Sequence, residues 1–218
     1  MDVFEELLFS CTSLQHLNIE GLLLTLKMAD GICKNSKTLQ VLNLNHAYYY
    51  YNNTDYLEDG YIGAIIKCCQ ELKILDFNNG NDVWLDIDNI KFLAENISPN
   101  VVRLNLYNHA VNHDNFKILL SRCNKIKVLI LKATSNGCED SLKTIRQYLN
   151  HTLEELSLSY YGQIGSTGVL ELKSMPRLKI LNLYISNEDS EYISKEDDEK
   201  VQNLRQHLPH LMIRTFFD

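Results

Sequence analysis

The sequence predicts an α/β solenoid, in which short parallel strands form one layer and helices form the other. Three observations support this fold class. A spaced apolar motif recurs along the whole chain, and the residues after each copy change to helical spacing. Hydrophobic residues make up 45% of the 218 residues, which is enough for a substantial core. We expect a single domain over residues 1–218.

The recurring motif reads apolar-x-x-apolar-x-apolar, a pattern typical of leucine-rich repeats. Successive copies start 25 to 33 residues apart, which clusters around the roughly 20 to 29 residues of that repeat class. The copies begin at Leu14, Leu39, Leu72, Val101, Ile126, Leu153, Leu178 and Leu208. The sequence therefore predicts a right-handed leucine-rich-repeat solenoid, or horseshoe, of about seven to eight repeats.

The end of each motif alternates as a short strand, with two side chains pointing into the core and the intervening ones pointing outward. The strands are expected near residues 16–20, 41–45, 74–78, 103–107, 128–132, 155–159, 180–184 and 210–214. One such strand cannot fold alone. Stacked copies bury each large apolar side chain with a gain of about 1.5–3 kcal/mol.

Helical spacing follows the strands, as at Phe116 and Leu119, and we expect Asp88, Asp114 and Asp140 to be N-caps. Because helices are wider than strands, the stack should curve, with the sheet on the concave face and the helices on the convex face. The turns lack the Asn or Cys of the common repeat consensus, so their backbone groups must be satisfied by other means.

The outward side chains of the predicted sheet form the candidate partner-binding site. They are Val41, Asn43, Ile74, Asp76, Arg103, Asn105, Tyr107, Val128, Ile130, Lys132, Ile180, Asn182 and Tyr184. Several are apolar although they should face water. Either branched residues were placed there because they suit strands, or a partner covers them. The sharper hypothesis is a partner laid across Tyr107, Ile130 and Tyr184.

The six cysteines could form disulfides, bind a metal or fill core positions. Cys11, Cys69 and Cys123 each stand three residues before the first apolar position of a motif. This shared offset predicts small buried residues of the repeat.

Patterns of catalysis or cofactor binding are missing from the sequence. There is no HExxH, no phosphate-binding loop and no nucleophile elbow. His109 and His113 are more typical of exposed turns than of a metal pair, and apolar residues interrupt the acidic group of Asp82, Asp86 and Asp88. We expect no enzyme activity, no cofactor and no metal.

Two insertions interrupt the repeat. A tyrosine-rich segment, residues 48–56, is either an interface anchor or compositional drift in an exposed loop. An acidic segment, residues 187–200, is interpreted as a solvated linker and an exposed helix start, with phosphorylation of Ser186, Ser190 or Ser194 as a further hypothesis.

Charge and the N-terminal residues limit the partners and the compartment. A net charge of −7 argues against nucleic acid as a partner. No secretory leader or transit peptide is recognisable at the start, and no apolar run is long enough to cross a membrane. We therefore expect a protein of the cytoplasm, the nucleus or both, with no membrane partner.

Beyond the generic repeat, the segments FEELLFSCTSLQHLNIEGLLL, CCQELKILDF, SPNVVRLNL, LLSRCNKIKVLIL, GVLELKSMPRLKILNL and QHLPHLMI occur in this order. In this they resemble the repeat region of F-box/leucine-rich-repeat proteins of the S-phase kinase-associated protein 2 type. The resemblance covers nearly the whole chain. It implies substrate recognition for a Skp-cullin-F-box ubiquitin ligase, in ubiquitin-dependent protein degradation, sometimes with a cyclin-kinase accessory subunit.

The chain departs from that family in three ways. It starts inside a repeat without an F-box, so the Skp adaptor is implied only if an F-box lies upstream. It ends at Phe216-Phe217-Asp218 without the long tail of the family. Asn79, Ala133 and Tyr160 stand where the charged and aromatic residues of a phosphorylated-substrate pocket are expected. The alternative function is a free-standing leucine-rich-repeat scaffold or inhibitor with no role in ubiquitination.

Overall fold

The computed structural model describes residues 3–46, 61–78, 87–107, 113–132, 138–159, 164, 166–185 and 195–217. Within them the chain is α/β, with eight strands in one sheet that follow sequence order and pair in parallel. The strands are β1 His16–Asn18, β2 Val41–Asn43, β3 Ile74–Asp76, β4 Arg103–Leu106, β5 Val128–Lys132, β6 Glu155–Ser159, β7 Ile180–Ile185 and β8 Met212–Phe217.

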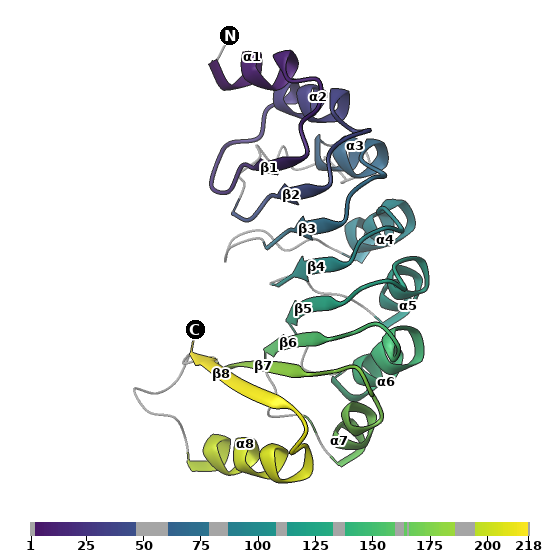
Figure 1. The fold of residues 1–218 in the computed structure, drawn as a ribbon, viewed down its shortest axis with the longest axis vertical. Coiled ribbons are helices and arrows are strands. Elements are labelled where there is room, and N and C mark those ends of the chain that lie inside the picture. Colours follow the sequence, from purple (N-terminus) through teal and green to yellow (C-terminus); the bar gives the residue numbers. More distant parts are fainter. Residues whose placement is uncertain are drawn as a thin grey trace.

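A helix precedes each strand in the described chain. The helices are α1 Val3–Ser10, α2 Leu26–Lys34, α3 Tyr61–Cys68, α4 Ile87–Asn96, α5 His113–Arg122, α6 Cys138–Leu149, α7 Ser166–Lys173 and α8 Lys195–His207. Helices α1 to α7 line one side of the sheet, and the stack curves so that the strands follow its inner side (Figure 1). The first residues of α8 belong to the acidic segment, which agrees with the predicted helix start.

The central leucine of the motif builds the core. Leu42, Leu75, Leu104, Leu129 and Leu156 are fully buried and lie opposite one another in the register of the sheet. Each therefore packs between the units on either side, which explains why one unit needs its neighbours. This column of leucines is the physical basis of the predicted periodicity.

The first seven strands begin at the predicted residues, but the prediction for β8 was wrong. It starts at Met212 instead of residue 210. Leu208 closes α8, because its N–H donates to the carbonyl of Leu204 over 2.8 Å. The turn bond from Leu211 to Leu208 then repeats the one from Leu178 to Met175. In the register of the sheet, Met212 pairs with Ile180 and Ile213 with Leu181. The first motif position, which lies two residues before Ile180 in the seventh unit, therefore falls at His210, and neither Leu208 nor Leu211 occupies it.

The prediction that three aspartates are helix N-caps was also wrong. Asp88, Asp114 and Asp140 lie inside the first turns of α4, α5 and α6. A carboxylate in a first turn is still favourable beside the positive end of the helix dipole. At the start of α2 the N-cap is Thr25, whose Oγ1 accepts a hydrogen bond from the N–H of Met28 at 3.1 Å.

The cysteines have different surroundings. Cys69 and Cys123 are fully buried, as predicted. Cys11 is only half-buried, contrary to the prediction, because it follows α1 at the end of the stack and has a neighbouring unit on one side alone. A disulfide joins Cys33, in the last turn of α2, to Cys68, the last residue of α3.

Candidate functional site

The outward-facing positions of the sheet form three rows that cross the strands. The first row contains His16, Val41, Ile74, Arg103, Val128, Glu155, Ile180 and Met212. The second contains Asn18, Asn43, Asp76, Asn105, Ile130, Ser157, Asn182 and Arg214. The third, two residues further along each unit, contains Glu20, Asn45, Asn78, Tyr107, Lys132, Ser159, Tyr184 and Phe216.

All the predicted site residues belong to these rows, but they are not equally accessible. Asn105 and Asn182 are almost completely buried, at 8% and 4% exposure, so neighbouring side chains cover them. Lys132 lies in β5, and its side chain is outside the described part of the structure. The remaining predicted residues are half-buried, which leaves them within reach of a partner.

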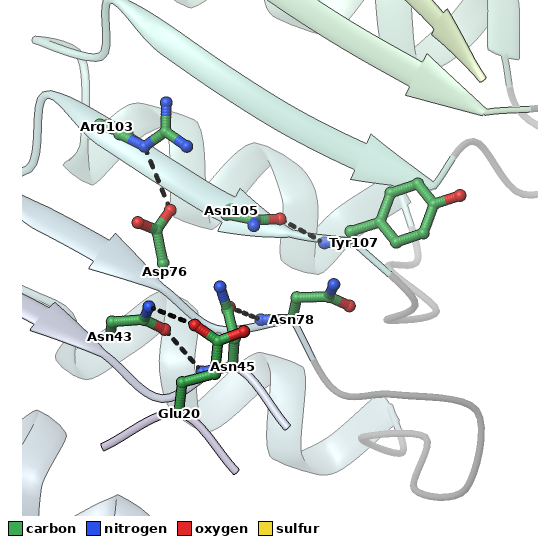
Figure 2. A network of polar contacts seen from close by, with 8 residues as sticks. All are labelled: Glu20, Asn43, Asn45, Asp76, Asn78, Arg103, Asn105 and Tyr107. Carbon is green, nitrogen blue, oxygen red and sulfur yellow. Dashed lines mark hydrogen bonds and ion pairs between the residues drawn. The ribbon is translucent and has the colours of Figure 1, made fainter. Parts of the chain in front are cut away.

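A polar zone occupies the N-terminal half of the face, built from Glu20, Asn43, Asn45, Asp76, Asn78 and Arg103 (Figure 2). Asn43 Nδ2 donates to Glu20 Oε2 over 3.2 Å. The N–H of Asn78 donates to Asn45 Oδ1 over 2.7 Å. These bonds join three successive units, so they fix the side chains of the zone relative to one another.

Asparagines at equivalent positions satisfy the backbone where the strands end. The Oδ1 atoms of Asn18, Asn43 and Asn105 each accept a hydrogen bond from the N–H two residues later, over 2.9, 2.8 and 3.0 Å. This is the local side-chain turn that asparagine forms readily. The turns are thus satisfied by residues other than the consensus position, as expected.

Asp76 and Arg103 form an ion pair within the polar zone. Arg103 Nε lies 3.1 Å from Asp76 Oδ1, and the two side chains are 37% and 18% exposed. Because both groups keep contact with water, we expect the pair to contribute no more than about 1 kcal/mol to stability. Its effect on the face is to neutralise two charges that a partner would otherwise have to match.

An aromatic zone of Tyr107, Tyr184 and Phe216 lies in the third row, and its members come from the fourth, seventh and eighth units. The ring centroids of Tyr107 and Tyr184 are 5.3 Å apart and tilted by 57°. Tyr184 and Phe216 stack, with centroids 5.1 Å apart and planes at 20°. Phe216 remains 40% exposed, and Met212 of the same strand is 55% exposed. Apolar surface here faces solvent.

Phe216, Met212 and Arg214 were missing from the predicted site. The last motif was placed too early in the sequence, so the predicted strand ended at residue 214 and did not reach Phe216. Residues 212–217 contain the β-branched and aromatic residues Ile213, Thr215, Phe216 and Phe217, which are a strand signal in themselves. A strand started at Met212 would have placed Met212, Arg214 and Phe216 on the outward face by the period of two.

Asn182 lies buried on β7, in the same strand as Tyr184 of the aromatic zone. Its Nδ2 donates to Glu155 Oε1 over 2.7 Å and to Ser157 Oγ over 2.9 Å. Its Oδ1 is a buried acceptor for which the described residues supply no donor. The two bonds from Nδ2 fix the amide orientation, because turning it would point Oδ1 at the Glu155 carboxylate.

Several sequence hypotheses concern residues outside the described parts. These are the tyrosine-rich segment, the serines 186, 190 and 194, and Asp82, Asp86, His109, Asn79, Ala133 and Tyr160. Among the residues that are described, no group of three or more His, Cys, Asp or Glu side chains is placed to hold a metal ion. Across the same residues, no helix has the length and apolar character needed to span a bilayer.

The chain matches no protein-family model and no curated protein.

Proposed function

We propose that this chain is a leucine-rich-repeat module that binds another protein on the inner face of its sheet and catalyses no reaction itself. The aromatic zone carries the proposal. Tyr107, Tyr184 and Phe216 gather in one place on the surface, and aromatic side chains are enriched among the anchors of protein interfaces. A soluble fold gains little from exposing apolar groups together unless a partner covers them.

The polar zone supports the same proposal. Hydrogen bonds between units already hold the side chains of Glu20, Asn43 and Asn45 in place before any partner arrives. Less side-chain freedom is then lost on binding, which favours affinity. A face with an apolar anchor at one end and fixed polar groups at the other also selects the orientation of its partner.

A photocrosslinking experiment tests the proposal. A photoreactive phenylalanine analogue replaces Tyr184 in the full chain, and a matched variant carries it at Ile118 on α5, which is 37% exposed on the helix side. We expect crosslinked proteins from position 184 that are absent from position 118. Identical products from both positions, or none from position 184, would contradict a binding role for the sheet face.

A narrower proposal is that the bound protein is a substrate for ubiquitin-dependent degradation. It is supported only by the sequence resemblance to F-box/leucine-rich-repeat proteins. Affinity capture with the proteasome blocked, followed by depletion of this chain, tests it. A captured protein that accumulates on depletion supports a ligase role. Unchanged levels of every captured protein would favour the scaffold or inhibitor.

A further inference from the structure

Two half-buried cysteines connect the second and third helices on the helix side of the stack. Cys33 lies in the last turn of α2 and Cys68 ends α3. Their Cα atoms are 5.7 Å apart, within the range that a disulfide requires, and a bond joins the two sulfurs. Both side chains are partly accessible, so small thiols and disulfides can reach them.

We propose that Cys33 and Cys68 form a reversible thiol–disulfide site that fastens these two units of the stack together. The bond closes a loop with a sequence separation of 35 residues. That loop contains β2, and therefore Val41 and Asn43 of the sheet face. Closing the loop restricts the unfolded chain and so favours the folded state. The inference is independent of the proposed function.

The chemistry needs an external disulfide as the oxidant, for which oxidised glutathione serves. The thiolate of one cysteine attacks a glutathione sulfur, and one glutathione leaves as its thiolate. The second protein thiolate then attacks the mixed disulfide, and the other glutathione leaves. The protein loses two electrons and two protons, and two reduced glutathione molecules form. An excess of reduced thiol drives the same steps backward.

The neighbouring Cys69 raises the question of which pair forms. Its Sγ lies only 3.6 Å from Sγ of Cys68. However, Cys69 is fully buried, and this burial raises the pKa of its thiol to about 12. Very little thiolate is then present at neutral pH, and the thiolate is the reactive form. Cys33 is accessible, so it is the expected partner of Cys68.

The test uses the full chain, incubated with oxidised glutathione or with a phosphine reductant. Peptide mapping without reduction should recover a Cys33–Cys68 crosslink from the oxidised sample alone. The thermal unfolding midpoint of the oxidised protein should exceed that of the reduced protein by roughly 5 to 15 °C, given the loop length. Cys33→Ser should abolish this difference, and the matched variant Cys11→Ser should keep it.

The mapping requires no substitution, so it decides the proposal even if Cys33→Ser fails to fold. Recovery of a Cys68–Cys69 crosslink, or of no crosslink after oxidation, would overturn the proposal. A difference in midpoint that persists in a folded Cys33→Ser protein would overturn it as well, because the stabilisation would then have another cause.

Discussion

Tyr107 and Tyr184 have ring centroids 5.3 Å apart although two complete strands, β5 and β6, separate the units that carry them. Neighbouring strands are spaced by about 4.8 Å, so their backbones are roughly 14 Å apart along the sheet. The two side chains therefore lean toward each other above the intervening strands. The inward curvature of the stack makes this contact possible (Figure 1).

Tyr184 should stabilise the fold through this contact and through its stacking on Phe216. We expect Tyr184→Ala to lower the free energy of unfolding by about 1–2 kcal/mol, because two ring contacts of a half-buried side chain are lost. Tyr184→Phe keeps both ring contacts, so its free energy of unfolding should remain close to that of wild type. Urea unfolding measures the difference. Equal losses in both variants would show that the hydroxyl, and not the ring, matters.

Asn35 connects three segments at the N-terminal end of the stack. Its side chain is 2% exposed, and its Nδ2 donates to the carbonyls of Leu8 and Gly31 over 3.1 and 3.0 Å. Its Oδ1 accepts a hydrogen bond from the N–H of Leu14. Asn35→Ala leaves these groups buried without partners, so it should cost about 2–4 kcal/mol of stability.

Asn96 provides the matched control for Asn35. It is half-buried and its Nδ2 donates to the carbonyl of Phe92, which lies within the same helix. Chemical unfolding of Asn96→Ala should show a loss below about 1 kcal/mol. If the two alanine variants were equally stable, the account of Asn35 as a link between units would be wrong.

Two helical glycines should respond differently to alanine. A Cβ at Gly31 would lie 2.9 Å from Cβ of Leu8, which cannot move without shifting α1. Overpacking should outweigh the gain in helix propensity, so Gly31→Ala should lose about 1–2 kcal/mol. At Gly168 the nearest atoms are methyl groups of Ile164 and Leu142, which can yield. Thermal unfolding should place Gly168→Ala closer to wild type than Gly31→Ala.

The buried thiols predict a loss of stability in alkaline solution. Burial raises the pKa of Cys69 and of Cys123 from 9.0 to about 12. Between these pH values the unfolded chain releases protons that the folded chain retains, so stability should fall as the pH rises from 9 toward 12. Replacing both residues with alanine should flatten this decline. If the double alanine variant lost stability between pH 9 and 12 as steeply as wild type, the two buried thiols would not be the cause of the decline.

Much of the fold follows from the sequence because burial enforces a regular pattern. Leu42, Leu75 and Leu104 must point inward at the same place in successive units, so their spacing predicted the strands. The same rule failed where two apolar residues competed. Leu208 and Leu211 are both buried, but Met212 pairs with Ile180 in the sheet, so neither leucine stands at the first motif position.

The residues of the outward sheet face were predictable from the sequence, but their arrangement was not. The period of two placed Tyr107, Ile130 and Tyr184 on the outward face. It could not show that the two tyrosine rings touch, because that contact depends on the curvature accumulated across the strands. Nor could it show that Asn182 is covered, since the bonds from Asn182 to Glu155 and Ser157 depend on side-chain packing between two neighbouring strands.

The most direct test of the binding face compares two isoleucines of the same unit. Ile130 lies on the sheet face in β5, and Ile118 lies on the helix side in α5. Quantitative affinity capture should be performed with wild type, Ile130→Asp and Ile118→Asp, each first shown to be folded by circular dichroism. We predict that Ile130→Asp loses the proteins that wild type captures and that Ile118→Asp retains them. Retention of the full set by Ile130→Asp would contradict the account.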